Sequence, residues 1–116
     1  MCKLGNRKPQ YLTDSDYENA ARLKQQDALL CFVADWSAPC REMAPAIEQL
    51  CDRLYDCVST YLVDLDAAPL LAAEYDVTSI PTLVFVQHGQ QRDRIIGLRS
   101  ADDVEKMVKK HFEPNK

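Results

Sequence analysis

An apolar run at residues 28–34, bounded by Asp27 and Asp35, constrains the fold of this chain more than any other feature. Its length and its content of Leu, Cys, Phe and Val are typical of a β-strand that is covered on both faces. Such a strand needs helices packed on either side of its sheet, so the run predicts an α/β architecture. At 116 residues, the chain has room for a single domain, 1–116, with its core at about 11–112.

Strands and helices are predicted to alternate around this run. We expect strands at 10–13, 28–34, 59–65, 82–87 and 92–97, and helices at 16–26, 40–55, 67–75 and from Ser100 onward. Ser15 and Glu18 form the S-x-x-E pattern of a capping box at the first helix. His88, Gly89 and Gln90 are typical of a hairpin turn. The order β-α-β-α-β-α-β-β-α predicts a mixed sheet of four to five strands with helices on both faces.

Two of the predicted helices carry an apolar stripe. In the helix at 40–55, apolar residues recur at intervals of three or four, at Met43, Ile47, Leu50, Cys51 and Leu54. Pro45 lies inside this helix and removes a backbone donor, so we expect a kink there. In the last helix the predicted buried face consists of Val104, Met107, Val108 and Phe112.

Charge and hydropathy exclude several classes of function. The formal net charge is −4, which disfavours a protein that binds the phosphate backbone of nucleic acid. The run at 28–34 is the longest apolar stretch, whereas a bilayer span needs about 20 residues. The first eight residues lack the apolar stretch of a secretory signal. We therefore expect a cytoplasmic monomer that binds neither nucleic acid nor a membrane.

The cysteines do not form a recognisable framework. There are five, and their odd number and irregular spacing argue against a set of structural disulfides: Cys2, Cys31, Cys40, Cys51 and Cys57. No pair has zinc-finger spacing, and the two histidines are far apart in the sequence. We expect mostly free thiols in a reducing cytosol and no metal site.

The stretch Trp36-Ser37-Ala38-Pro39-Cys40 follows the buried strand and opens the long helix. A dithiol exchange site needs two sulfurs separated by two residues at a helix start, where the helix dipole favours the first thiolate. The second sulfur then attacks the mixed disulfide and releases the product. Here Ser37 takes the first position, and its hydroxyl cannot form a disulfide. Cys40 is therefore the only thiol of the motif, and a two-cysteine cycle at this motif is chemically impossible.

A second motif, Ile80-Pro81-Thr82, follows about 40 residues after Cys40 and directly precedes a strand. With this motif and Pro45, the chain resembles the thioredoxin family over about 11–112, where the first motif reads W-C-G-P-C. Trp36, Pro39 and Cys40 match that motif, Ala38 is a mild change and Ser37 is the serious one. The resemblance implies a thioredoxin fold and thiol–disulfide exchange without a cofactor, with Cys40 and position 37 as the catalytic positions.

The resemblance also implies a groove for polypeptides beside the motif. In the family, the bond before the proline that matches Pro81 is cis, and the residue that matches Ile80 pairs with an extended substrate segment. Gly89 matches a hairpin glycine and Gly97 a groove glycine. The implied substrate-binding residues are Trp36, Ala38, Pro39, Ile80, Pro81 and Gly97. The implied partners are cysteine-containing or extended polypeptides, with thioredoxin reductase or glutathione as the reductant.

The chain departs from the family behind the motif as well. Cys31 matches a buried Asp that assists proton transfer to the second cysteine, and Leu62 matches its partner Lys. Both halves of that proton relay are therefore missing, and Val33 matches a position that is usually a larger aromatic residue. One hypothesis for Cys31 is an auxiliary thiol beneath Cys40 that forms a Cys31–Cys40 disulfide. The alternative is that Cys31 is a packing residue.

Two functions stay open at this point. In the first, the chain belongs to a protein-disulfide reductase whose dithiol activity is blocked by Ser37 in place of a parent cysteine. In the second, Ser37 is native and the domain is a redox-inactive module that binds extended or unfolded polypeptides. In either case Cys40 keeps the ability to form a mixed disulfide with an outside thiol.

Overall fold

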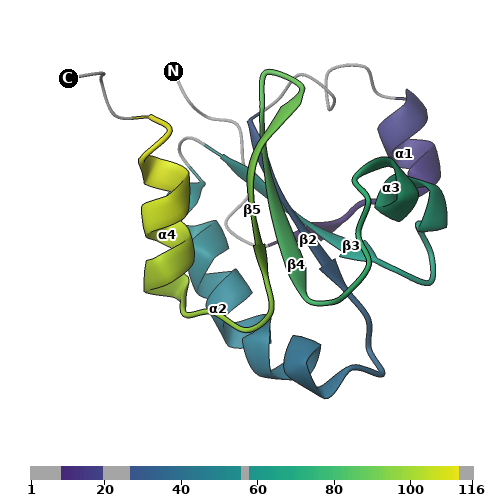
Figure 1. The fold of residues 1–116 in the computed structure, drawn as a ribbon, viewed down its shortest axis with the longest axis horizontal. Helices are drawn as coiled ribbons and strands as arrows, with labels where there is room; N and C mark the ends of the chain where they lie inside the picture. Colours follow the sequence, from purple (N-terminus) through teal and green to yellow (C-terminus); the bar gives the residue numbers. More distant parts are fainter. Residues whose placement is uncertain (1–8, 20–26, 56–57, 113–116) are drawn as a thin grey trace.

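The computed structural model describes residues 9–19, 27–55 and 58–112, which form a five-stranded sheet with helices on both faces (Figure 1). The predicted α/β class and element order are confirmed. In chain order the elements are β1 (Gln10–Tyr11), α1 (Asp14–Asn19), β2 (Ala28–Val33), α2 (Ala38–Leu54), β3 (Ser59–Asp64), α3 (Pro69–Glu74), β4 (Thr82–Gln87), β5 (Gln90–Ile96) and α4 (Ala101–Lys109).

The sheet has the strand order β1-β3-β2-β4-β5, with β2 at its centre. Strands β1, β3 and β2 run parallel, and β4 and β5 complete the sheet in antiparallel pairs. The first five residues of β2 are buried, as predicted for a strand that is covered on both faces. Val33 pairs with Asp64, and Phe32 pairs with Thr82. The ends of β2 and β3 and the start of β4 therefore share one edge of the sheet.

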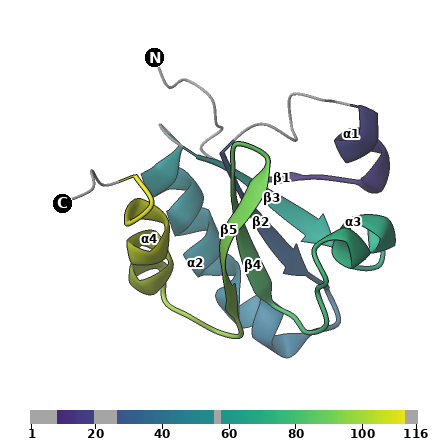
Figure 2. The same cartoon turned by 45° about the horizontal axis from the view of Figure 1, so that its top comes forward.

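Helices α2 and α4 cover one face of the sheet, and α1 and α3 cover the other (Figures 1 and 2). Each face of the sheet has its own hydrophobic core. Because side chains alternate along a strand, β2 contributes Leu29 and Cys31 to the core under α2 and α4, and Leu30 and Phe32 to the core on the face of α3. No helix in the described ranges is long and apolar enough to cross a bilayer.

Helix α2 begins at Ala38, two residues before the predicted start at Cys40. The reason is its cap: the Ser37 hydroxyl accepts a hydrogen bond from Cys40 N at 3.4 Å, and the Ser37 carbonyl accepts one from Arg41 N at 3.1 Å. Pro39 lies in the first turn and Pro45 lies inside the helix. The apolar stripe is buried as predicted. The kink at Pro45 stays a prediction.

The first strand and helix differ from the prediction. Strand β1 ends at Tyr11 and α1 begins at Asp14, because Thr13 and Asp16 form a capping pair and Ser15, the predicted cap, lies inside the helix. Asp16 N donates to Thr13 Oγ1 at 3.1 Å, and Thr13 N donates to Asp16 Oδ2 at 3.4 Å. The predicted helix end at residue 26 lies outside the described residues.

Helix α3 receives its cap from a distant part of the chain. Its N-cap residue, Ala68, has no side chain that can cap it. Instead, the Asp14 carboxylate accepts hydrogen bonds from Leu70 N at 3.1 Å and from Leu71 N at 2.7 Å. The helix spans Pro69–Glu74 rather than the predicted 67–75. The amides of residues 67 and 68 instead donate hydrogen bonds to the carbonyl of Asp64, in the turn that follows β3. Strand β3 itself ends at Asp64, one residue before its predicted end.

The β4–β5 hairpin is tighter than predicted. Strand β4 has its predicted bounds, but β5 begins at Gln90 rather than residue 92. His88 and Gly89 have positive φ values of 55° and 80°, which suits a two-residue turn between twisted strands. Gln87 and Gln90 therefore pair directly across the turn.

The last helix, α4, is capped by the Ser100 hydroxyl, which accepts a hydrogen bond from Asp103 N at 3.1 Å. Val104, Met107 and Val108 are buried as predicted. The predicted burial of Phe112 is wrong. Because α4 ends at Lys109, Phe112 leaves the helical stripe and is 40% exposed.

Candidate functional site

The sheet edge at the end of β2 brings the two sequence motifs together. Residues 34–40 leave β2 there, and the peptide bond between Ile80 and Pro81 is cis, as the resemblance implies. Gly97 N donates to the Pro81 carbonyl at 2.8 Å, and Gly97 has a φ of 94°, a region that favours glycine. Pro81 is buried and Ile80 is partly buried. Because Phe32 pairs with Thr82, Pro81 and its partner Gly97 lie at the same end of the sheet as the segment that leaves β2.

Ser37 and Cys40 lie at the start of α2 and are largely buried, with exposed fractions of 7% and 5%. Ala38 and Pro39, which separate them, are exposed. The helix dipole at this end would stabilise a thiolate at position 37. The Ser37 hydroxyl does not ionise at neutral pH, and it serves as the helix cap instead. The position of the attacking thiol is thus filled by a group with a structural role.

Trp36 stands beside the motif and is 64% exposed. Its indole Nε1 donates a hydrogen bond to Asp66 Oδ2 at 2.9 Å, and Asp66 N donates to Asp64 Oδ1 at 2.9 Å. Asp66 is a site residue that the sequence analysis missed. The signal was present, because Asp64 and Asp66 follow β3, and the ends of parallel strands β2 and β3 meet at one edge.

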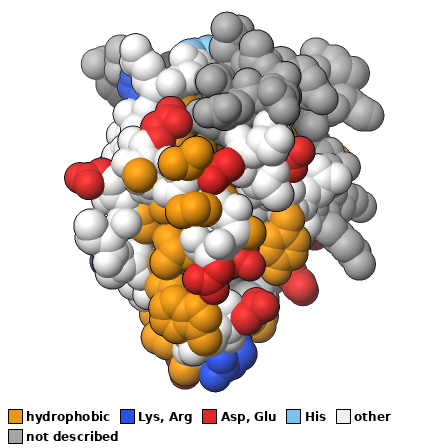
Figure 3. Space-filling view, turned by 90° about the vertical axis from the view of Figure 1, so that its right-hand side faces the viewer, with side chains coloured by type: hydrophobic (Ala, Val, Ile, Leu, Met, Phe, Trp, Pro, Cys, Tyr) orange, Lys and Arg blue, Asp and Glu red, His pale blue; other side chains and the backbone are white. Residues whose placement is uncertain are grey.

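The surface of this part of the molecule combines apolar and acidic side chains. Figure 3 shows a band of apolar side chains running to the lower edge of the face that includes α3, with acidic side chains among them. Leu70 and Trp36 are two of the most exposed large apolar residues, at 65% and 64%. Such a surface offers both apolar contact and negative charge to a polypeptide.

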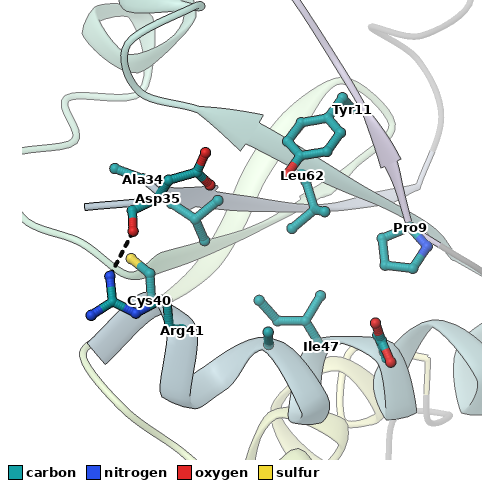
Figure 4. Close-up of a pocket in the computed structure, with 11 residues that line it drawn as sticks. Pro9, Tyr11, Ala34, Asp35, Cys40, Arg41, Ile47 and Leu62 are labelled. Atoms are coloured by element: carbon teal, nitrogen blue, oxygen red, sulfur yellow. Dashed lines mark hydrogen bonds between the residues drawn. The ribbon is translucent and has the colours of Figure 1, made fainter. Parts of the chain in front are cut away.

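A cavity of about 450 Å³ lies behind Cys40, between α2 and the strands β1 and β3 (Figure 4). Of the residues predicted for the site, all of which lie in the described ranges, Cys40 alone lines it. The sequence analysis missed this cavity. The sequence contained part of the information, because four of the lining residues recur at helical intervals on one face of α2: Cys40, Ala44, Ile47 and Glu48.

The predicted relay positions are adjacent and uncharged. Cys31 pairs with Leu62 on β3 in the parallel register, and both contribute to the core beneath α2. Cys31 is fully buried. This burial, together with a smaller effect of Cys51, raises the pKa of Cys31 well above its ordinary value. Cys31 is therefore a neutral thiol at neutral pH and cannot accept a proton as a carboxylate does.

None of the described cysteines, Cys31, Cys40 and Cys51, takes part in a disulfide. The Cys31–Cys40 disulfide therefore stays a prediction, and the electrostatic neighbour that affects Cys31 is Cys51. Cys2 and Cys57 lie outside the described residues. Within the part of the chain that the structure describes, no group of three His, Cys, Asp or Glu residues could hold a metal ion.

The family model for thioredoxin matches residues 8–110 of this sequence. The chain belongs to the thioredoxin family. A thioredoxin from Chlamydia trachomatis is 37% identical over 83 residues, which cover 72% of this chain and 80% of the relative. A thioredoxin from Staphylococcus aureus is 32% identical over 101 residues, which cover 87% of this chain and 95% of the relative.

Solved structures agree with this assignment. A mutant thioredoxin from Halobacterium salinarum superposes with a TM-score of 0.83 at 25% identity and covers 97% of both chains. A thioredoxin from Fasciola hepatica gives a TM-score of 0.76 at 30% identity, covering 89% of this chain and 98% of the other. The predicted thioredoxin fold is therefore confirmed, and thiol–disulfide exchange is the general chemistry of the family. The individual roles of the site residues stay predictions.

Proposed function

We propose that this thioredoxin-family protein exchanges disulfides through Cys40 alone, and that Ser37 blocks the dithiol cycle. One observation carries the proposal: a serine hydroxyl, bonded to Cys40 N at 3.4 Å, occupies the N-cap position where the cycle needs an attacking thiol. Cys40 is the remaining sulfur at this end of α2.

The chemistry then stops at a mixed disulfide. The Cys40 thiolate attacks one sulfur of a substrate disulfide, the other sulfur leaves as a thiolate, and a new bond joins Cys40 to the substrate. Because position 37 holds no second thiol, the mixed disulfide persists until an outside thiol attacks it. Glutathione is a suitable reductant for this step. Thioredoxin reductase is less suitable, because a disulfide within the motif cannot form.

The groove supports polypeptides as the substrates of this exchange. Pro81, with its cis peptide bond, and Gly97, whose N–H donates to the Pro81 carbonyl, lie at the end of the sheet where the segment with the exposed Trp36 leaves β2. Partly buried Ile80 precedes the cis bond, at the position that pairs with an extended substrate segment in the family. Cysteine-containing, extended segments are therefore the substrate class.

An insulin-reduction assay tests the block at position 37. We expect this chain to be inert and Ser37→Cys to reduce insulin, because the variant restores the missing attacking thiol. Ser100→Cys is the matched control, because Ser100 is also a helix N-cap but lies at the start of α4. Insulin reduction by the unmodified chain at the rate of Ser37→Cys would contradict the proposal.

A redox-inactive binding module is the second candidate, and the uncharged relay favours it. With Cys31 and Leu62 in these positions, no buried carboxylate–ammonium pair can assist Cys40. Under this function both the chain and Ser37→Cys stay inert toward insulin, and the chain slows aggregation of an unfolded protein without needing the Cys40 thiol. The insulin assay on Ser37→Cys, together with an aggregation assay on Cys40→Ser, separates the two candidates.

A further inference from the structure

The cavity behind Cys40 is separate from the predicted polypeptide groove. In Figure 4, Cys40 lies at one end of the cavity, Leu62 and Ile47 face each other across its middle, and Pro9 lies at the other end. None of the groove residues Trp36, Ile80, Pro81 and Gly97, all of them described, belongs to its lining. Cys40 therefore links the sequence motif to a cavity of about 450 Å³ that the predicted groove residues do not line.

The shape of the cavity is elongated and its walls are mostly apolar. Along α2 the lining runs from Cys40 to Glu48, which is roughly 12 Å at the rise of an α-helix. Val33, Leu62 and Tyr11 form the facing wall. The charged lining residues, Asp35, Arg41 and Glu48, are all exposed at the surface, and Arg41 Nη1 already donates to the Asp35 carbonyl at 2.7 Å.

We propose that this cavity is a small-molecule site for elongated, apolar disulfides, and that Cys40 is its covalent attachment point. The inference rests on the proposed function, because it requires Cys40 to form mixed disulfides. It adds a ligand class to that function: an alkyl or aryl chain that fills the space between α2 and β3, with its sulfur at the Cys40 end.

The reaction is an exchange that needs no external oxidant. For a ligand disulfide R–S–S–R, the Cys40 thiol loses its proton and attacks one sulfur, a Cys40–S–S–R bond forms, and the S–S bond of the ligand breaks. The second R–S group leaves and takes up the proton. Ser37 cannot displace the attached ligand, so the adduct persists until another thiol attacks it.

The cavity selects for apolar ligands by desolvation. A volume of about 450 Å³ lies within the usual range of ligand pockets, and apolar walls favour burial of an apolar chain. A charged chain would lose its hydration against Val33, Ile47 and Leu62 without gaining a partner in the middle of the cavity. Charged disulfides are therefore poor ligands here.

Two thiol-reactive probes with the same leaving group test this inference. The probes are n-hexyl methanethiosulfonate and its anionic counterpart, sulfonatoethyl methanethiosulfonate. The rate of labelling at Cys40 is measured by quenched peptide mapping and divided by the rate with free cysteine. We expect the hexyl probe to be favoured at least about tenfold, which burial of two methylene groups would provide.

Matched variants locate this preference in the cavity. Ala44 is exposed on α2 and lines the cavity, so Ala44→Phe should fill it and remove the preference. Ala73 is an exposed alanine on α3, and Ala73→Phe should keep the preference. Circular dichroism confirms that both variants are folded.

Each remaining outcome has a definite meaning. Equal relative rates for the two probes, or an equal preference in the two variants, would overturn the cavity proposal while leaving mixed-disulfide formation intact. If neither probe labels Cys40 in the folded protein, the proposed function fails together with this inference. A Cys2–Cys40 crosslink in the untreated protein would show that the chain's own N-terminal segment, which precedes Pro9, occupies the cavity instead.

Discussion

At the scale of single residues, Ser37 is the most visible departure from the family motif, and we propose that the pair Cys31 and Leu62 limits how far it can be reversed. Cys31 and Leu62 pair in register on neighbouring strands and lie in the core beneath α2. Neither side chain carries a charge. A thiol restored at position 37 would therefore complete the motif, but neither residue could transfer a proton to or from Cys40. We therefore expect Ser37→Cys to be a slow reductase.

A pair of added substitutions tests this expectation. In the Ser37→Cys background, Cys31→Asp alone should destabilise the fold, because it buries a carboxylate without a partner. Adding Leu62→Lys should recover part of the stability and raise the insulin-reduction rate above that of Ser37→Cys. Urea unfolding and the insulin assay give the two readouts. A triple variant no faster than Ser37→Cys would show that the relay positions do not limit the rate.

At the scale of elements, an ionic cluster joins strand β5 to the end of helix α4. Asp93 accepts from His111 Nε2 at 3.1 Å and lies 3.3 Å from Lys110 Nζ. Partial burial alone would raise the pKa of Asp93, but hydrogen bonds from His111, Arg94 N and Lys110 outweigh it and lower the pKa below its ordinary value of 3.8. The ionised carboxylate therefore stabilises this junction.

This cluster predicts a loss of stability in acid. A carboxyl group with a lowered pKa in the folded state stabilises the protein above its ordinary pKa, and this contribution disappears as the pH falls through 3.8 toward the folded value. Asp93→Asn should be less stable than the unmodified chain at pH 7, and the difference should shrink below about pH 4. Urea unfolding across this range measures it. A difference that does not change with pH would rule out the carboxylate as the cause.

At the scale of the whole molecule, the architecture could be predicted from the sequence because each helix or strand was predicted from a pattern that extends over many residues. The apolar run at 28–34 and the stripe on α2 are each spread over many residues, so local errors do not change them. The errors lie at element ends. Helix α1 begins two residues before its predicted start, with Thr13 and Asp16 as its capping pair, and the helix end at Lys109 exposes Phe112.

The candidate site was predictable only in part. Residues of the two motifs could be named from the sequence, because each motif is contiguous. Asp66 and the cavity could not, because they depend on which strands share an edge and on how much space is left between α2, Val33 and Leu62. That space is set by packing between residues far apart in the chain, and no local pattern encodes it.

The bond between Asp14 and helix α3 has a consequence for how this molecule folds. Because a carboxylate from α1 caps the amides of Leu70 and Leu71, docking of α1 stabilises the first turn of α3. We expect Asp14→Ala to speed amide hydrogen exchange throughout α3 while leaving α2 and α4 protected. Uniform acceleration in all helices would contradict this. Faster exchange confined to α3 would show that α3 opens as a local unit, separately from the face of the sheet that α2 and α4 cover.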